Sequence, residues 1–120
     1  MISRYKNVAD VGCKILIVED DNTLGQALRE ALTRKGHFVF LVSRPDEAYQ
    51  LVLRQSFDFL MVDCLLPQMT GIDLIKKIQA EATTPITAKI LLMSGIYSDK
   101  TFQQESLQET KAIGFLKKPF

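Results

Sequence analysis

The chain has 120 residues and a mass of 13.6 kDa, which is the length of one domain with room for one hydrophobic core. Hydrophobic residues make up 47% of it and charged residues 24%, so the composition excludes the disordered, collagen-like and disulfide-rich classes. The net charge of +1 gives no general basis for binding nucleic acid or an anionic membrane, and neither a membrane span nor a signal peptide is visible. We expect a cytoplasmic domain with neither kind of contact.

Short apolar runs alternate with helical patterns along most of the chain. Residues 1–13 show no usable period and are interpreted as a leading arm, whereas residues 14–120 are interpreted as one domain. Because it is apolar at every position, the run 38–42 is predicted to be covered on both faces. The runs that are typical of strands are 14–18, 38–42, 59–62, 90–93 and 113–116.

Four helical patterns separate these runs. Thr23 and Gln26 fit a capping box for the first helix, and Gly36 ends it. Pro45 opens the second helix and Gly71 leads into the third, while the fourth spans 98–110. The inward-facing candidates are Leu24, Leu28, Ala31 and Leu32 in the first helix, Ala48, Leu51 and Val52 in the second, Ile72, Ile75 and Ile78 in the third, and Phe102 and Leu107 in the fourth.

Strands that alternate with helices predict a parallel sheet with helices on both faces, which is a doubly wound α/β fold. Ligands bind to such folds at the carboxyl ends of the strands, where the strand order reverses. Glu19 and Asp20 follow the first strand, and Asp63 follows the third. In the flavodoxin-like order 2-1-3-4-5 the first and third strands are neighbours, so these carboxylates are predicted to meet.

Clustered carboxylates repel one another, and a bound cation relieves the repulsion. Oxygen ligands at a partly open site suit Mg²⁺, and one lysine would bring the summed charge to zero. Such a site can accept a phosphoryl group, for which Asp63 is the natural nucleophile. Ser94 follows the fourth strand and Lys118 the fifth, and both would bind phosphoryl oxygens.

The same residues stand in motifs that resemble one known family. In chain order the motifs are Ile17-Val18-Glu19-Asp20-Asp21, Val62-Asp63, Leu66-Pro67, Thr70-Gly71, Met93-Ser94-Gly95 and Lys118-Pro119-Phe120. They resemble the receiver domain of a two-component response regulator, from about Lys14 to Phe120. The resemblance implies a regulatory phosphoacceptor rather than an enzyme, with a sensor histidine kinase or a histidine phosphotransfer protein as the phosphoryl donor.

The resemblance also implies a role for single residues. Asp20 would bind Mg²⁺ directly and Glu19 through water, Asp63 would be the phosphoacceptor and a metal ligand, and Leu65 would offer its backbone carbonyl to the metal. The remaining roles fall to Ser94 as the switch hydroxyl, Phe115 as the switch aromatic, Lys118 as the phosphate-binding lysine and Pro119 as the residue after a cis peptide bond.

Three departures from the family pattern lead to further expectations. A receiver normally has a fifth helix after its last strand, so we expect either a fragment of a longer protein or an uncovered face that the leading arm or a second copy covers, as in a homodimer. The segment between Ser94 and Lys118 is longer than usual, which makes the position of its helix uncertain. Leu65 and Ile96 are apolar where polar side chains would orient water, which predicts slow autodephosphorylation.

Two other functions remain open. One is an interaction module that binds its partner without phosphorylation, and the other is an aspartyl-phosphate hydrolase, which Leu65 in place of a second aspartate disfavours. The acidic residues after the first strand also suit a solvated turn in which one of them caps a helix. Cys13 and Cys64 are expected to be buried free thiols, and His37 is expected to lie away from the acidic residues.

Overall fold

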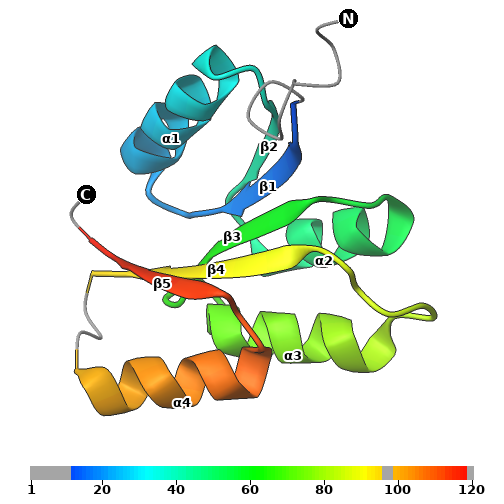
Figure 1. The fold of residues 1–120 in the computed structure, drawn as a ribbon, viewed down its shortest axis with the longest axis vertical. Helices are drawn as coiled ribbons and strands as arrows, with labels where there is room; N and C mark the ends of the chain where they lie inside the picture. The colour runs from blue at the N-terminus through cyan, green and yellow to red at the C-terminus, as the bar shows by residue number, and fades with distance from the viewer. Residues whose placement is uncertain (1–11, 96–98, 119–120) are drawn as a thin grey trace, which may run out of the picture.

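The computed structural model describes residues 12–95 and 99–118, and within them the chain forms one parallel sheet of five strands. The strand order is β2-β1-β3-β4-β5, as the sequence predicted. Figure 1 shows β2 and β5 at the two edges of the sheet with β3 between them. The strands are β1 (Lys14–Val18), β2 (Phe38–Val42), β3 (Phe59–Asp63), β4 (Lys89–Ser94) and β5 (Gly114–Lys117).

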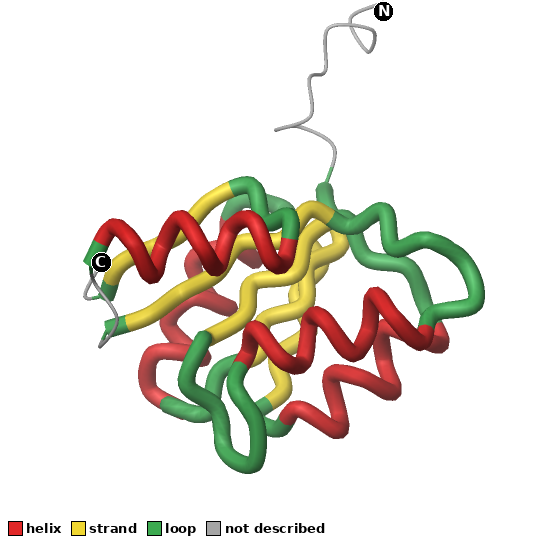
Figure 2. The backbone as a smooth tube through the Cα atoms, turned by 90° about the horizontal axis from the view of Figure 1, so that it is seen from below, coloured by secondary structure: helices red, strands yellow, loops and turns green. Residues whose placement is uncertain are grey.

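Helices cover the sheet unequally. Three of the four described helices, α2, α3 and α4, lie on one face, while α1 lies alone on the other (Figures 1 and 2). None of them has the length and hydropathy that crossing a membrane would require. The helices are α1 (Asn22–Arg34), α2 (Pro45–Arg54), α3 (Gly71–Glu81) and α4 (Lys100–Thr110).

The alternation of side chains along β1 divides the core into two layers. Leu16 and Val18 point towards α2 and α3, whereas Ile15 and Ile17 point towards α1. Leu16 and Ile17 are both fully buried, because the central strands are covered on both faces. These interior strands are the rigid base from which the loops at their carboxyl ends project.

The first helix begins two residues earlier than the capping box predicted. Asp21 is the N-cap, and its Oδ1 accepts a hydrogen bond from the backbone N–H of Leu24 at 3.1 Å. The capping role predicted for Thr23 is therefore wrong, because Asp21 occupies the N-cap position and Thr23 lies inside the helix. Ala31 is exposed rather than inward. Gly36 follows the helix end with φ of +93°, which agrees with its predicted role as the stop.

The fourth helix buries hydroxyls rather than the expected apolar side chains. Ser106 and Thr110 are its buried residues, whereas Phe102 and Leu107 are only half-buried. Each hydroxyl donates to the backbone carbonyl four residues earlier, at 2.7 Å, so burial leaves no polar atom unpaired. The helix begins at Lys100 after the N-cap Asp99, and the predicted start at residue 98 lies outside the described residues.

The two edge strands also differ from expectation. Phe38 at the start of β2 is 66% exposed, so the prediction that this strand is covered on both faces is wrong for its first residue. β2 is the outermost strand of the sheet, a position that hydrophobic periodicity does not reveal. At the other edge, Ile113 is 62% exposed and β5 begins one residue later than predicted.

Candidate functional site

The register of β1 and β3 brings carboxylates from distant parts of the chain together. Val18 of β1 is paired with Val62 of β3, so the residues that follow, Glu19 and Asp63, lie at the same edge of the sheet. Glu19 and Asp63, with the adjacent Asp20, place carboxylate oxygens within 4.8 Å of one another. The meeting of these side chains therefore follows directly from the strand order.

The three carboxylates differ in their exposure. Glu19 is 2% exposed and Asp63 is 5% exposed, whereas Asp20 is exposed. Oε2 of Glu19 accepts a hydrogen bond from the backbone N–H of Asp21 at 3.1 Å, which fixes the orientation of that carboxylate. The cluster thus has a buried base formed by two carboxylates and an exposed side on which Asp20 stands.

Lys118 supplies the positive charge of the cluster. Its Nζ atom lies 2.6 Å from Oε1 of Glu19 and 3.3 Å from Oδ2 of Asp63. The backbone N–H of Lys118 donates to the carbonyl of Ser94 at 2.8 Å, so the chain is held against the end of β4. At Gly95, a Cβ atom would lie 3.3 Å from the Cβ of Lys118, so the absence of a side chain there leaves room for the lysine. Lys117, the residue before it, is exposed.

Burial and charge shift the pKa values of the groups in the cluster. Burial raises the pKa of Glu19 above its ordinary value, and the hydrogen bond from Lys118 only partly offsets this. Burial lowers the pKa of Lys118, but the hydrogen bond to Glu19 and the charge of Asp63 outweigh it, so the net shift is upward. Lys118 therefore stays protonated at neutral pH. Burial also raises the pKa of the neighbouring Cys64 thiol to about 12.

The loop after β3 is held close to Asp63. The backbone N–H of Leu65 approaches Oδ1 of Asp63 at 3.4 Å, and the N–H of Gly71 donates to the carbonyl of Cys64 at 2.9 Å. A Cβ atom at Gly71 would lie only 2.1 Å from the carbonyl oxygen of Asp63, so only glycine allows α3 to begin this close to the strand. Sequence reasoning identified Gly71 as a helix start and missed this contact. Leu65 itself is 44% exposed beside the cluster.

Ser94 and Phe115 occupy different surroundings. Ser94 is 1% exposed at the carboxyl end of β4, the same edge as the carboxylates. Phe115 lies on β5 and packs against the core on the side of α4, where its ring meets that of Phe102 edge-on at 6.1 Å between centroids. The peptide bond before Pro119 and the side chain of Ile96 lie outside the described residues.

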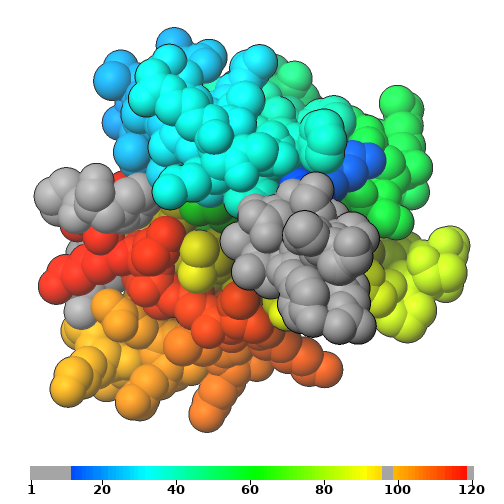
Figure 3. All heavy atoms as spheres, turned by 45° about the horizontal axis from the view of Figure 1, so that its top comes forward, coloured from blue at the N-terminus to red at the C-terminus, as the bar shows by residue number. Residues whose placement is uncertain are grey.

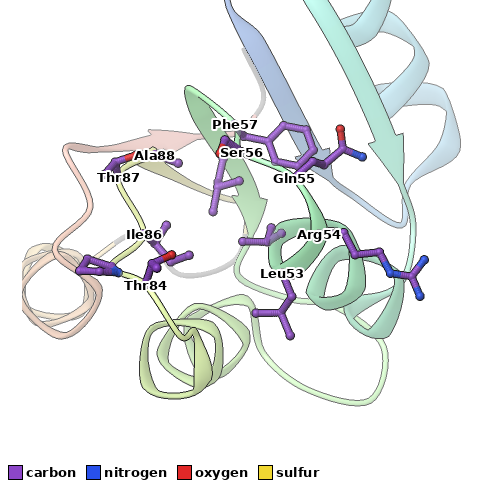
Figure 4. A pocket seen from close by; sticks show the side chains of 12 residues that line it. Leu53, Arg54, Gln55, Ser56, Phe57, Thr84, Ile86, Thr87 and Ala88 are labelled. Atoms are coloured by element: carbon purple, nitrogen blue, oxygen red, sulfur yellow. The ribbon is translucent and has the colours of Figure 1, made fainter.

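Two other features lie apart from the carboxylate cluster. Nδ1 of His37 accepts a hydrogen bond from the backbone N–H of Cys13 at 3.1 Å, at the amino end of the sheet. His37 therefore lies away from the acidic residues, as predicted. A pocket of about 150 Å³ also lies at that end, between α2 and the loop before β4, with Leu53 and Ile86 on opposite sides (Figure 4). Its lining contains no carboxylate. Both cysteines are buried free thiols, as predicted.

The donor set suits a small divalent cation. The three carboxylates and the one ammonium group leave two negative charges uncompensated. The ligand atoms are all oxygens, which favours Mg²⁺ over the metals that prefer nitrogen or sulfur, and the exposed Asp20 leaves room for water or a phosphoryl oxygen. The residues present therefore fit a divalent cation next to the carboxylate of Asp63.

Comparisons with known proteins bear on the family and the fold of the chain. A family model described as the response regulator receiver domain matches residues 15–120. The transcriptional regulatory protein CrdR of Helicobacter pylori is 28% identical over 107 residues, which cover 89% of this chain and 48% of that protein. The chain thus spans about half the length of the curated relatives it matches.

Two solved structures extend the comparison to the fold. A putative response regulator from Chloroflexus aurantiacus superimposes with a TM-score of 0.78 at 29% identity, covering 91% of this chain and 87% of that one. A response regulator protein from Burkholderia pseudomallei, solved with a phosphorylated aspartic acid, a calcium ion and citrate, has a TM-score of 0.76 at 26% identity. It covers 88% of this chain and 59% of that one.

Proposed function

Because the chain belongs to the response regulator receiver domain family, we propose that it is a switch in which Asp63 accepts a phosphoryl group. The observation that supports this most is the surroundings of Asp63. Its carboxylate is 5% exposed, lies 3.3 Å from the ammonium group of Lys118, and shares its edge of the sheet with Glu19 and Asp20. A carboxylate held between a cation and a metal-binding pair is placed to act as a nucleophile towards phosphorus.

In the proposed reaction a carboxylate oxygen of Asp63 attacks the phosphorus atom of a phosphohistidine on the donor protein. A P–O bond forms and the P–N bond breaks, so the phosphoryl group moves to Asp63 as an acyl phosphate. The imidazole of the donor leaves with the electron pair of the broken bond and takes up a proton. Lys118 binds one of the transferred oxygens through its ammonium group, which compensates charge as the group arrives.

Glu19, Asp20 and Asp63 would hold Mg²⁺, with the backbone carbonyl of Leu65 as a further ligand. When bound, the ion supplies positive charge that neutralises the phosphoryl oxygens. The solved Burkholderia relative supports this part of the proposal, since it carries a phosphorylated aspartic acid and a divalent cation, there calcium. Lys118 already compensates one of the charges on the buried carboxylates, so a single divalent ion would bring the cluster to neutrality.

Ser94 and Phe115 would transmit the change. In the proposal the hydroxyl of Ser94 donates a hydrogen bond to a phosphoryl oxygen, and the loop after β4 follows it. Phe115 would then change its packing against Phe102 of α4, because the two rings are in edge-on contact. The surface formed by α4 and β5, which lie next to each other in orange and red in Figure 3, would differ between the two forms of the protein, and a partner or an attached segment would detect that difference.

Intact mass spectrometry tests the proposal with a small phosphodonor such as acetyl phosphate in place of the kinase. The purified chain is incubated with the donor and Mg²⁺, and the expected result is the gain of one phosphoryl group. Asp63→Asn is expected to gain none. Asp73→Asn serves as the matched control, because Asp73 is an exposed aspartate in the first turn of α3.

The other possible results of this experiment each favour a different function or a different acceptor residue. A parent chain that stays unmodified in Mg²⁺ would favour a phosphorylation-independent interaction module. Continuous hydrolysis of a phosphate ester, with no stable modified species, would favour a hydrolase. Equal modification of Asp63→Asn and the parent chain would mean that another residue is the acceptor.

A further inference from the structure

Within residues 12–95 and 99–118, no strand pairs with the outer edge of β2. β2 is the last strand on its side of the sheet, and all five of its residues are apolar. Phe38 at its start is 66% exposed. Soluble proteins usually protect such an edge with a charge, a proline or a bulge, because an unpaired apolar strand attracts another strand. β2 contains neither a charged residue nor a proline. The strand at the opposite edge contains a charged residue, Lys117, as well as Gly114.

The hydrogen bonds of β2 show which of its backbone groups face outward. The N–H of Phe38 donates to the carbonyl of Cys13 at 2.8 Å, and the carbonyl of Val42 accepts from the N–H of Glu19 at 3.0 Å. Residues in a parallel strand alternate in the direction of these groups, so Phe38, Phe40 and Val42 bond towards β1. The N–H and C=O groups of Val39 and Leu41 therefore point away from the sheet, and they have no backbone partner among the described residues.

From this arrangement we propose that two copies of the chain associate through β2, antiparallel to each other, about a two-fold axis that passes beside Phe40. A two-fold axis requires the same strand on both sides and an antiparallel direction. Centring the pair on the middle residue uses the full length of the strand. Val39 of one copy then lies opposite Leu41 of the other, and each pair exchanges both of its backbone hydrogen bonds.

The side chains of the strand are complementary in this register. Phe40 lies opposite its own counterpart at a position without hydrogen bonds, where side chains approach most closely. Phe38 lies opposite Val42 of the second copy on the same face of the extended sheet. The exposed ring of Phe38 would then cover an apolar neighbour instead of facing water. The match of the strand with itself favours a second copy over a strand from an unrelated protein.

Analytical ultracentrifugation combined with amide hydrogen exchange by NMR tests the proposal on the purified chain. The mass is expected to rise from monomer to dimer with concentration. Exchange of the Val39 and Leu41 amides is expected to slow by about tenfold or more over the same range. The amides of Phe38, Phe40 and Val42, which bond towards β1, are expected to be protected at every concentration.

Two variants separate this edge from other contacts. Val39→Pro removes an outward N–H and leaves the bonds to β1 in place, so it is expected to abolish the dimer. Phe38→Lys adds a charge to the edge and is expected to weaken self-association by about tenfold or more. Ile113→Lys is the matched control, because Ile113 is similarly exposed, at 62%, next to the opposite edge strand, and it should have no effect.

The results that would overturn the proposal are equally specific. A chain that stays monomeric, with exchange of Val39 and Leu41 independent of concentration, rules out pairing with a second copy. A dimer that Ile113→Lys disrupts and Phe38→Lys does not would place the contact at the other edge. Because Phe38→Lys changes an exposed side chain, it remains informative if Val39→Pro fails to fold.

Discussion

The Nζ atom of Lys118 lies 2.6 Å from Oε1 of Glu19. The residue that follows the last strand, β5, therefore forms an ion pair with the residue that follows the first strand, β1. Asp63 on the central strand is a second anion near the same ammonium group, at 3.3 Å. The side chains of Glu19 and Asp63 are 0% and 6% exposed, so solvent does little to screen their charges. The lysine therefore stabilises two buried charges at once.

Replacing Lys118 by methionine should destabilise the protein, because it leaves these carboxylates without a counter-charge. We expect the free energy of unfolding, measured with urea in EDTA, to fall by about 3 kcal/mol. Mg²⁺ should restore part of the loss. Lys117→Met, which changes an exposed neighbouring lysine, should have little effect. A loss that is identical with and without Mg²⁺ would contradict a shared site for the lysine and the ion.

The stability of the protein should depend on the titration of Glu19. Because burial raises its pKa, the folded chain holds this proton more tightly than the unfolded chain, whose carboxyl titrates near 4.5. In EDTA, stability from this group is therefore greatest below pH 4.5 and decreases as the pH rises from there through the raised pKa. Glu19→Gln should remove that decrease, and the change is read from urea unfolding at a series of pH values.

The matched control for this titration is Glu30→Gln, because Glu30 is exposed on α1 and forms a long ion pair with Arg34, at 4.0 Å. This variant should keep the pH dependence of the parent chain. A Glu19→Gln variant whose stability follows the parent curve in EDTA would show that the Glu19 carboxyl is not held in an unfavourable environment.

Replacing Gly71 by alanine should destabilise the protein, because the added methyl group would meet the backbone that carries Asp63. Its Cβ would meet the backbone of Asp63 at 2.1 Å, which flexible side chains cannot relieve, so we expect a loss of about 2 kcal/mol. At Gly25 the new Cβ would meet only the side chain of Leu41, at 3.0 Å, and the helix would gain from alanine. Gly25→Ala should therefore cost less. Thermal denaturation of both variants measures the difference, and equal losses would contradict the argument.

Metal affinity should depend on Asp20 with little change in stability, because this carboxylate is exposed and lies within 4.8 Å of the other two. We expect Asp20→Asn to weaken Mg²⁺ binding by about tenfold or more in isothermal titration calorimetry. Asp21→Asn is the matched control, since asparagine also caps a helix and Asp21 caps α1. Equal weakening by both variants would point to general charge rather than to direct ligation.

Leu65 should lengthen the lifetime of the phosphorylated form. Its side chain is apolar, 44% exposed, and two residues from Asp63, so it offers nothing to orient an attacking water molecule. We expect Leu65→Asn to accelerate loss of the phosphoryl group by at least about tenfold, measured by intact mass against time. Leu53→Asn changes another exposed leucine, at the far end of the sheet, and should leave the rate unchanged.

The sequence was sufficient for the features that depend on alternation. Strands that alternate with helices predicted a parallel sheet covered on both faces, and the flavodoxin-like order assumed for it, β2-β1-β3-β4-β5, is the order observed; that order places Glu19 beside Asp63. The predictions that were wrong concern residues for which the sequence allows two equally good roles, or whose surroundings the sequence does not reveal. Asp21 and Thr23 are both good caps, and only the geometry selects between them. The buried hydroxyls of Ser106 and Thr110 were missed because bonding to the preceding turn hides their polarity.

Exposure at the edges of the sheet and close backbone contacts were beyond the reach of the sequence. A fully apolar strand is typical of the interior, yet β2 lies at the edge with Phe38 exposed. The contact between Gly71 and the carbonyl of Asp63 leaves no trace in a hydrophobic pattern, because glycine is also an ordinary residue for a turn. The roles assigned to Ser94 and Phe115 remain predictions.

The order in which the cluster is completed follows from the position of its members along the chain. During synthesis on the ribosome Glu19 and Asp63 emerge well before Lys118, the last of the four charged residues. A nascent domain that has paired β1 with β3 but has not yet added β5 therefore holds carboxylates with no ammonium group beside them. At that stage a divalent cation from the surrounding solution would supply the counter-charge that Lys118 provides later, so the proposed Mg²⁺ site would also stabilise the partly formed domain.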